Sequence, residues 1–342
     1  MGFFKRRWKQ ILIGGLSLCT ILFGLGFYEY YHIQPEHHFK HPPTISSDQV
    51  IADSDSDSAS EDQEKIKAAN ALRNIPKLKE NVLNILLIGS DERKGQHAGH
   101  SDSMILLHAD LNKHQYNTVS IPRDTRVYLA GYGYTKLTSV QYIKQATSGS
   151  KAGIEAAVSS IMQLTGVPIN YYVETNYEGL QSMVEALGTV DVDVPFDVKL
   201  THPWYKENKD KIIKKGTQTL DGKMITELVH ERYSLKRVDF DRQLLQEKVL
   251  VAIAKAALQP SNFTDLPHLV STTSNFLIGT NMSNTDILSL GLAVKSLNPN
   301  KDIHYYQLTG HSETLYDDIL KSNNSQLILD QDNLQQVMTH FR

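Results

Sequence analysis

The sequence predicts an α/β protein in which a sheet is layered with helices, preceded by one transmembrane helix. Three observations lead to this prediction: an uncharged apolar run near the N-terminus, three closely spaced apolar runs of strand length after residue 80, and helical periodicity alternating with short apolar runs beyond residue 150. Alternating elements of this kind imply a sheet covered by helices. The length of 342 residues corresponds to two domains at most, at roughly 150 residues per domain.

Composition excludes several classes of protein. The chain has 35 Lys and Arg against 38 Asp and Glu, with an isoelectric point near 6.5. This balance argues against a nucleic-acid binder built on a basic face, so no nucleic acid is expected as a partner. The single cysteine, Cys19, excludes a disulfide framework and a thiolate cluster for zinc or iron–sulfur.

The N-terminal apolar run has the properties of a signal anchor. Residues 11–28 carry no charge, and aromatic residues extend the run to Tyr31. A bilayer core needs about 20 apolar helical residues. Because basic residues precede the run, we expect residues 1–10 to be a cytoplasmic tail, residues 11–31 to span the membrane, and the rest to lie outside the cell. A cleaved signal peptide is the alternative, but no small-x-small cleavage site follows the run.

Residues 32–80 are expected to form an extracellular tether. Their centre is the acidic, Ser-rich run DSDSDSASEDQE, residues 53–64. Low hydrophobicity and clustered acid are typical of a solvated linker. The run lacks the glycine and the terminal Glu of a calcium-binding loop. A short helix over residues 65–73 is expected to lead into a folded domain at residues 81–342.

The domain opens with three predicted strands, at Val82–Gly89, Met104–Ala109 and Tyr116–Ile121. The polar connectors between them are too short, or too Gly-rich, for a crossover helix, so the strands are expected to form an antiparallel meander. The later elements follow from 3.6-residue periodicity or from short apolar runs. Helices are expected around residues 154–164, 177–187, 223–231, 239–258 and 287–297, and strands at 190–194 and 303–308.

The meander brings four charged residues to one edge of the sheet. Asp91 and Arg93 follow the first strand, Asp102 begins the second, and Arg123 follows the third. Two carboxylates placed close together repel each other unless a counter-ion joins them. A divalent cation bound by Asp91 and Asp102, with the arginines facing a phosphate, would resolve this conflict. A salt-bridge network that caps the sheet explains the same four residues equally well.

Several motifs in a fixed order resemble the LytR–CpsA–Psr family. The run SDER…SDSMILLHAD…VSIPRDTRVYLAGYGYTKL (residues 90–137) is similar to the family's core. Residues 170–194 resemble its middle section, and residues 216–232 and 239–246 resemble its arginine-rich third section. The anchor, tether and domain layout also agrees with this family.

The resemblance implies a fold, an activity and a location. The fold would be a three-layer sandwich with a mixed central sheet flanked by helices and a long apolar pocket for a polyprenyl chain. The activity would be that of a phosphotransferase, moving an anionic glycopolymer (teichoic acid or a capsular-type polysaccharide) from a polyprenyl-pyrophosphate carrier to peptidoglycan. The protein would act at the outer face of a cell membrane, in a bacterium of the Gram-positive type.

The resemblance also implies roles for individual residues. Asp91 and Asp102 match the residues associated with Mg²⁺, or with Mn²⁺ in its place, and Asp102 and Arg123 would be catalytic. The expected pyrophosphate-binding residues are Arg93, Arg123, Lys136, Arg232, Arg242 and Gln246. Such a set suits the chemistry, because phosphoryl transfer depends mainly on positioning and charge stabilisation. The planar arginine fork holds phosphate oxygens in pairs.

The chain departs from the family pattern in its third section. Ser234 stands where a second arginine is common, and Leu245 precedes Gln246 where an arginine is usual. Asp124 could be a base or the structural partner of Arg126, and pairing is the favoured interpretation. A transcriptional regulator is disfavoured, because the domain is expected outside the cell and shows no DNA-binding motif. A non-catalytic scaffold that binds the lipid-linked polymer remains open.

Overall fold

The computed structural model describes residues 28, 30–45, 59–93, 95, 96, 98–271 and 276–342. The expected cytoplasmic tail and almost all of the expected membrane segment, residues 11–31, lie outside this range. Among the helices that the structure does describe, none is both long and apolar enough to cross a bilayer.

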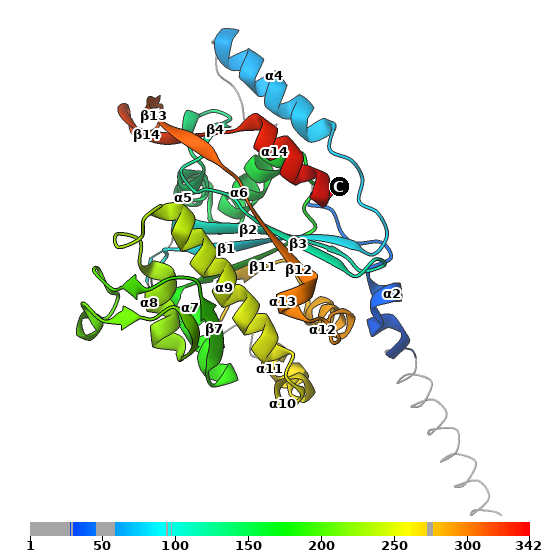
Figure 1. Cartoon of the computed structure of the whole chain (residues 1–342). Helices are drawn as coiled ribbons and strands as arrows, with labels where there is room; N and C mark the ends of the chain where they lie inside the picture. The colour runs from blue at the N-terminus through cyan, green and yellow to red at the C-terminus, as the bar shows by residue number, and fades with distance from the viewer. Residues whose placement is uncertain (1–27, 29, 46–58, 94, 97, 272–275) are drawn as a thin grey trace, which may run out of the picture.

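A mixed sheet of six strands forms the centre of the protein (Figure 1). The expected meander is confirmed, because β1 pairs antiparallel with β2, and β2 pairs antiparallel with β3. One parallel strand flanks each side, β6 beside β1 and β12 beside β3, and the short β11 lies antiparallel on the outer edge of β6. The six strands are β1 (Val82–Ser90), β2 (Ser101–Asp110), β3 (Gln115–Ser120), β6 (Tyr171–Asn176), β11 (Gly279–Thr280) and β12 (Ile303–Gln307).

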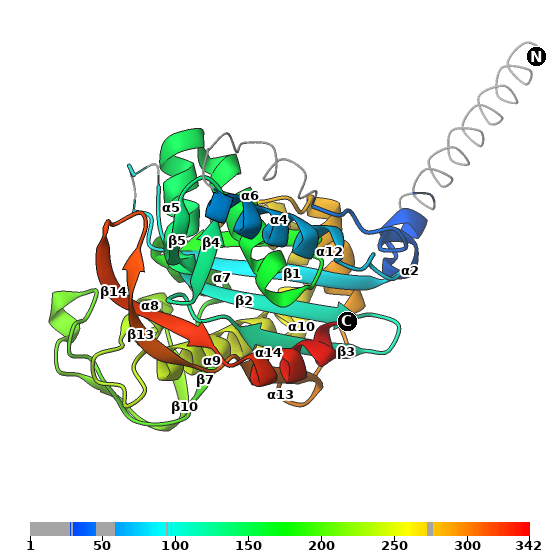
Figure 2. The ribbon, with the colours of Figure 1, turned by 90° about the horizontal axis from the view of Figure 1, so that it is seen from above.

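Both faces of the sheet are covered, which explains why β1 is apolar almost throughout. Successive side chains of a strand point to opposite faces. Leu86 and Ile88 join a core with α5 (Leu137–Ser148) and α6 (Ser150–Thr165). Leu83 and Ile85 join a second core, on the other face, with α12 (Asn284–Ala293). Figure 1 shows α5 and α6 on one side of the strands and α9 and α12 on the other, so the chain is layered as the sequence predicts. Figure 2 shows β1, β2 and β3 side by side within the sheet.

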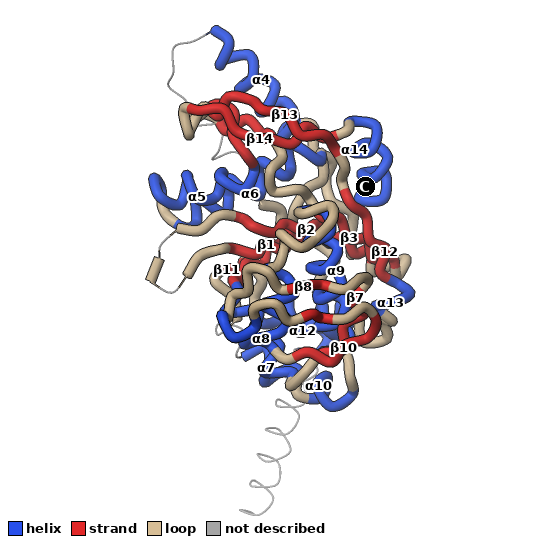
Figure 3. The backbone as a smooth tube through the Cα atoms, turned by 60° about the vertical axis from the view of Figure 1, so that its left-hand side comes forward, coloured by secondary structure: helices blue, strands red, loops and turns tan. Residues whose placement is uncertain are grey.

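A third hydrophobic core lies beside the sheet, and its helices contribute residues to the site described below. It is built from helices α7, α8 and α9 with the two-stranded ribbon β7–β10. The expected strand at residues 190–194 is present, but it pairs with β10 and not with the central sheet. Figure 3 shows this ribbon next to α7 and α8, below the main strands. The elements are α7 (Tyr177–Leu187), β7 (Val190–Val194), β10 (Gly216–Leu220), α8 (Gly222–His230) and α9 (Asp239–Ala257).

Several elements were not predicted. The hairpin β4–β5 follows the meander and leads directly into α5, and a second hairpin, β13–β14, packs near it. Short helices lie in the remaining connections. The bounds are β4 (Arg126–Leu129), β5 (Gly133–Lys136), β8 (Val198–Lys199), β9 (Ile212–Ile213), α10 (Pro260–Thr264), α11 (Leu266–Ser271), α13 (Pro299–Asp302), β13 (Gly310–Asp317), β14 (Ser322–Leu329) and α14 (Gln331–Met338).

Part of the expected tether is packed on the domain, so a domain start at residue 81 is too late. The short helix α2 (Pro35–His38) precedes Phe39, whose side chain is fully buried. The His38 Nε2 atom lies 2.8 Å from Asp286 Oδ1 on α12. The helix α4 (Ala59–Arg73) begins earlier than the expected residue 65 and buries Leu72 against the core of α5 and α6. Residues 46–58, which include the start of the acidic run, lie outside the described range.

Replacing Phe39 by Ala is expected to destabilise the whole domain. Deleting a fully buried aromatic ring costs roughly 3–5 kcal/mol in the free energy of unfolding. The matched control is Ile66→Ala, also in the expected tether, where the side chain is 59% exposed. Urea unfolding followed by circular dichroism measures both. Equal, near-zero changes for the two variants would mean that residues 32–45 behave as a free tether.

Candidate active site

The meander brings the four predicted charged residues to one cleft. Asp91, Arg93, Asp102 and Arg123 all line it. The third core contributes its other wall, including two more of the predicted arginines. The further lining residues are Gln96, Ala98, His100, Tyr142, Tyr177, His202, Trp204, His230, Arg232, Tyr233 and Arg242.

Asp102 lies at the centre of the cleft and is bound from both walls. Its Oδ1 accepts a hydrogen bond from Arg123 Nη1, and its Oδ2 lies 3.1 Å from Arg242 Nη1. Arg242 Nη2 also donates to the Asp102 carbonyl at 2.9 Å, and the Tyr177 hydroxyl donates to Oδ2 at 3.3 Å. Burial alone would raise the pKa of Asp102, but the guanidiniums of Arg242 and Arg123 outweigh burial and hold this pKa below its usual value. The carboxylate is therefore charged at neutral pH.

Arg242 is a buried cation that two carboxylates compensate. Its side chain is only 2% exposed, and its Nη2 lies 2.9 Å from Asp239 Oδ1, one turn earlier on α9. Asp239 also lies 3.4 Å from Arg123 Nε. Burying an unpaired charge is costly, so the two aspartates are what allow a guanidinium at this depth. The two arginines and two aspartates form one network, referred to below as the Asp102 network.

Polar atoms without partners gather in this cleft. Among the residues that the structure describes, Arg123 Nε, Arg242 Nε and His230 Nδ1 are buried and make no hydrogen bond. Buried polar atoms without partners are rare in native proteins, and each points to a missing partner or a functional role. Two guanidiniums with unused N–H groups provide donors that suit an anion such as a phosphate.

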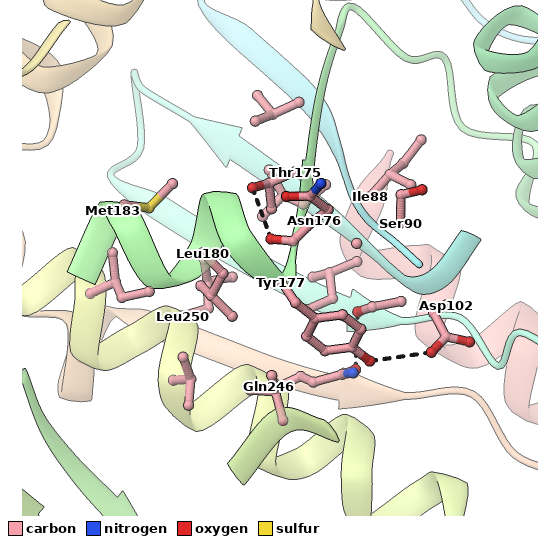
Figure 4. A pocket seen from close by; sticks show the side chains of 18 of the residues that line it. Ile88, Ser90, Asp102, Thr175, Asn176, Tyr177, Leu180, Met183, Gln246 and Leu250 are labelled. Carbon is pink, nitrogen blue, oxygen red and sulfur yellow. Dashed lines mark hydrogen bonds between the residues drawn. The ribbon is translucent and has the colours of Figure 1, made fainter. Parts of the chain in front are cut away.

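An apolar channel meets the cleft at Asp102 and Tyr177, which line both cavities. The channel runs between the sheet and helices α7, α8 and α9, and it encloses about 880 Å³, part of it open to solvent. Figure 4 shows Tyr177 and Gln246 between the apolar side chains of α7 and α9 and the carboxylate of Asp102. The apolar lining consists of Leu87, Ile88, Ile105, Val173, Leu180, Met183, Val229, Val249, Leu250, Ile253 and Leu277.

Two predicted phosphate ligands lie outside the cleft lining. Gln246 lines the channel, where its Oε1 accepts a hydrogen bond from Ser103 Oγ at 3.0 Å. Lys136, at the end of β5, places its Nζ 2.9 Å from Asp124 Oδ1 and lines neither the cleft nor the channel. Asp124 is therefore paired with Lys136, and the expected pairing with Arg126 is wrong.

Aromatic rings hold the two outer arginines. The guanidinium of Arg93 lies 4.9 Å from the ring centroid of Trp204, and that of Arg232 lies 4.8 Å from the ring of Tyr233. Contacts of this kind favour a cation at a protein surface. Arg93 and Arg232 thus line the cleft as predicted, but they stand on its rim, outside the Asp102 network.

Sequence reasoning missed Asp239 of the Asp102 network and several residues of the cleft lining, among them Tyr177, Trp204 and His230. Asp239 could have been found, because it precedes Arg242 by three residues and so shares its helix face. Tyr177 begins α7 and Trp204 lies in the connection between β8 and β9. Their sequence neighbourhoods carry no signal that relates them to Asp102.

Comparison with known proteins identifies the family. The chain belongs to the LytR_cpsA_psr family, whose model matches residues 44–342. The resemblance seen in the sequence is thereby confirmed.

Relatives in this family have been named for a transfer reaction. The chain is 33% identical over 186 residues to the polyisoprenyl-teichoic acid–peptidoglycan teichoic acid transferase TagU of Bacillus cereus, which covers 54% of this chain and 56% of TagU. It is 30% identical over 224 residues to the corresponding enzyme TagV of Bacillus subtilis, covering 65% of this chain and 55% of TagV. The chain thus spans about half the length of these curated relatives.

Solved structures agree with the fold. The crystal structure of B. subtilis TagV has a TM-score of 0.62 at 28% identity, covering 76% of this chain and 95% of that one. The structure of TagT bound to LIIa-WTA has a TM-score of 0.60 at 27% identity, covering 76% of this chain and 89% of that one. The α/β fold with a mixed central sheet is therefore shared with this family.

A buried glutamate on β6 is linked through Gln141 to the residue that precedes Asp102. Glu174 on β6 is 2% exposed, and its Oε1 accepts a hydrogen bond from Gln141 Nε2 at 2.5 Å. Gln141 in turn accepts a hydrogen bond from Ser101, the residue before Asp102. Burial, assisted by the nearby charge of Glu92 and opposed by the bond from Gln141, raises the pKa of Glu174 to about 7.

This raised pKa predicts a specific pH dependence of stability. An acid whose pKa is higher in the folded than in the unfolded state binds more protons when folded, so stability falls as pH rises between the two values, from about 4.5 to about 7. The free energy of unfolding should fall by roughly 3 kcal/mol at most over this pH range. Glu174→Gln removes the charge, so it should match the native chain near pH 5 and exceed its unfolding free energy near pH 8.

The exposed Glu178→Gln serves as the control, and urea unfolding at both pH values is the measurement. If the native chain and Glu174→Gln respond identically to pH, then Glu174 is ionised throughout and its burial is compensated in another way.

Proposed function

We propose that the protein is an extracellular phosphotransferase that moves an anionic glycopolymer, of the teichoic acid or capsular type, from a polyprenyl-pyrophosphate carrier to peptidoglycan. The observation that carries this proposal is the junction of an apolar channel with a cleft that holds two arginines with unused N–H groups. A molecule with a long apolar tail and a pyrophosphate head matches both cavities at once. The names of the relatives TagU and TagV point to the same class of reaction.

Binding would use the two cavities for different parts of the donor. Each methylene group of the tail that leaves water for the channel contributes about 0.8 kcal/mol. The pyrophosphate would accept hydrogen bonds from Arg123 and Arg242, whose Nε atoms make no hydrogen bond within the protein. Asp102 accepts hydrogen bonds from both guanidiniums, so the two arginine side chains are already positioned before the donor binds. Preorganised donors of this kind need no rearrangement as charge develops.

The chemical step would be an in-line displacement at phosphorus. The oxygen of a peptidoglycan hydroxyl forms a bond to the phosphorus that bears the sugar, while the bridging P–O bond breaks. The electron pair leaves with the polyprenyl phosphate, and the glycopolymer stays joined to peptidoglycan by a phosphodiester. Negative charge builds on the phosphoryl oxygens during this step, and Arg123 and Arg242 would stabilise it.

We also propose that a Mg²⁺ or Mn²⁺ ion takes part, with Asp91 and Asp102 as its protein ligands. Both aspartates line the cleft, but no group of three or more His, Cys, Asp or Glu suited to a metal occurs in the part of the chain that the structure describes. Mg²⁺ commonly uses one or two carboxylates and completes its shell with substrate phosphates and water, so this donor set fits when pyrophosphate is bound. The ion would neutralise charge on the pyrophosphate.

The location is likewise a proposal. The uncharged run at residues 11–28 and the basic residues before it support a single membrane anchor with the N-terminus in the cytoplasm and the domain outside. Phe39 and α2 attach the first residues after this run directly to the domain. An anchor there would keep the domain, and with it the channel, close to the membrane that contains the lipid-linked donor.

Replacing Arg123 by Ala should abolish transfer far more than binding. A charge that acts chiefly as the phosphoryl bond breaks lowers turnover rather than affinity, and the expected loss is about 10³-fold or more. Arg123→Lys should recover only part, because a point charge cannot reproduce the fork. Transfer is measured with a polyprenyl-pyrophosphate-linked saccharide and soluble peptidoglycan, and affinity with polyprenyl pyrophosphate alone.

The matched control is Arg126→Ala, because Arg126 is close in sequence but bonds to Gln326, away from the cleft. Equal losses of affinity and turnover in Arg123→Ala would assign this residue to ground-state binding. A native chain that binds the donor but forms no phosphodiester would instead be the scaffold considered above.

Metal dependence is expected to follow from the two aspartates. Excess chelator should stop transfer, and added Mg²⁺ should restore it. Asp91→Asn should raise the Mg²⁺ concentration for half-maximal activity about tenfold or more, because one ligand charge is lost. Asp197→Asn, an exposed site that bonds to Lys214 and Lys215, is the control. Undiminished turnover in excess chelator would mean that neither aspartate holds a metal ion needed for transfer.

A further inference from the structure

His230 occupies a position in the cleft that the donor's binding does not explain. It is the last residue of α8, where Ile225, Leu228 and Val229 pack into the third core. Its own ring lines the charged cleft together with Asp102, Arg123 and Arg242. The ring therefore stands next to the place where the pyrophosphate would react, but it belongs to neither the Asp102 network nor the aromatic pairs on the rim.

Two aromatic rings fix the imidazole from the sides. Tyr177 lies 5.5 Å from His230 between ring centroids at an interplanar angle of 77°, and Trp204 lies 5.5 Å away at 79°. Trp204 is itself held by its backbone N–H, which donates to Glu227 Oε2 at 2.7 Å. The imidazole is thus positioned by packing, as a group that must meet a substrate atom needs to be.

The two ring nitrogens differ in their surroundings. Nδ1 is buried and has no hydrogen-bond partner. Nε2 makes no hydrogen bond to the described residues, and the partly exposed ring lines the cleft. Both Tyr177 and Trp204 pack against this imidazole in T-shaped pairs, and the negative face of an aromatic ring favours an N–H group over a lone pair. We therefore assign the proton of the neutral ring to Nδ1, which leaves the lone pair of Nε2 open to the cleft.

The surroundings keep this ring neutral. Burial lowers the pKa of His230, assisted by Arg242 on α9, and these effects outweigh Glu227 and Glu231 on either side of His230 in sequence and Asp102 on β2. The two glutamates are also engaged elsewhere, Glu227 with the backbone of Trp204 and Tyr205, and Glu231 with that of Thr201. A neutral imidazole is the form that can accept a proton.

The other basic groups in and beside the cleft each contact a polar partner. Asp102 and Asp239 are paired with Arg123 and Arg242. His100 lies 3.3 Å from Asp91 through Nδ1. His202 contacts Thr201 through its Nδ1 at 3.1 Å and lies against Tyr233 on the rim. Among the cleft histidines that the structure describes, His230 is the one for which neither ring nitrogen has a hydrogen-bond partner.

We propose that His230 is the general base of the transfer, and that its Nε2 takes the proton of the attacking peptidoglycan hydroxyl. This inference rests on the proposed function. As the hydroxyl oxygen bonds to phosphorus, its proton passes to Nε2, and the bridging P–O bond breaks with its electron pair on the polyprenyl phosphate. The imidazolium that forms is close to Asp102 and then returns its proton to solvent or to the departing phosphate.

The test compares His230→Gln and His230→Phe with the control His311→Gln in the full chain, because His311 is an exposed histidine on β13 that contacts Glu313 and lines neither cavity. Phe preserves a ring beside Tyr177 and Trp204 but has no nitrogen, so it separates packing from proton transfer. The donor is a polyprenyl-pyrophosphate-linked disaccharide, the acceptor is soluble peptidoglycan, and kcat is measured between about pH 5 and pH 9. Affinity for polyprenyl pyrophosphate and the melting temperature are measured on the same samples.

The native chain should show a fall in kcat at acid pH, and both His230 variants should lose this fall together with about 10²–10⁴-fold of kcat. The affinity of both variants for polyprenyl pyrophosphate should change by less than about threefold. The kcat of the control should likewise stay within about threefold of the native value. A base role is overturned if either variant keeps its kcat or its acid limb, or if affinity falls as much as kcat. A native chain that binds the donor and transfers nothing would overturn the proposed function itself, which is a different result.

Discussion

The pairing of Asp102 with Arg123 and Arg242 is the interaction on which the site depends. Arg242 is almost completely buried, and a guanidinium at that depth requires compensation by nearby carboxylates. Asp102 comes from the start of β2, Arg123 follows β3, and Arg242 lies on α9 of the third core. One carboxylate therefore joins the central sheet to the helical part of the domain, and any element that moved would leave a buried charge without a partner.

This arrangement also places two unlike cavities side by side. The same helix, α9, presents Arg242 to the cleft from its first turn and Val249 and Ile253 to the channel from later turns. Tyr177 stands at the junction, with its ring in the channel and its hydroxyl on Asp102. An amphiphilic ligand can thus contact charged and apolar surfaces without distortion, because a rigid helix fixes the spacing between them.

The sequence was sufficient for the parts of the site that local rules determine. Short apolar runs with short connectors define the meander, and strand direction then places Asp91, Asp102 and Arg123 at one edge. The sequence was insufficient where packing between residues far apart in the chain determines the structure. The segment YYVETN at residues 171–176 is short and half polar, yet it pairs with β1 because the sheet supplies partners for its backbone. Phe39 is a single aromatic residue in a polar stretch, so average composition concealed its burial.

The departures from the family pattern have physical explanations in the fold. Leu245 is fully buried among apolar side chains of the third core, where burying an arginine's charge would be costly. Lys136 matches a family motif, but its position at the end of β5 directs it to Asp124. A motif locates a residue along the chain, whereas its neighbours in space decide whether it meets the ligand.

The most direct measurement is a crystal structure of the chain with geranylgeranyl pyrophosphate. The account predicts that the prenyl chain lies between the sheet and helices α7 and α9, and that phosphate oxygens lie about 3 Å from the guanidinium nitrogens of Arg123 and Arg242. Asp102 should keep its contacts with both arginines. A prenyl chain bound outside the channel, or a pyrophosphate that does not contact these two arginines, would contradict the account.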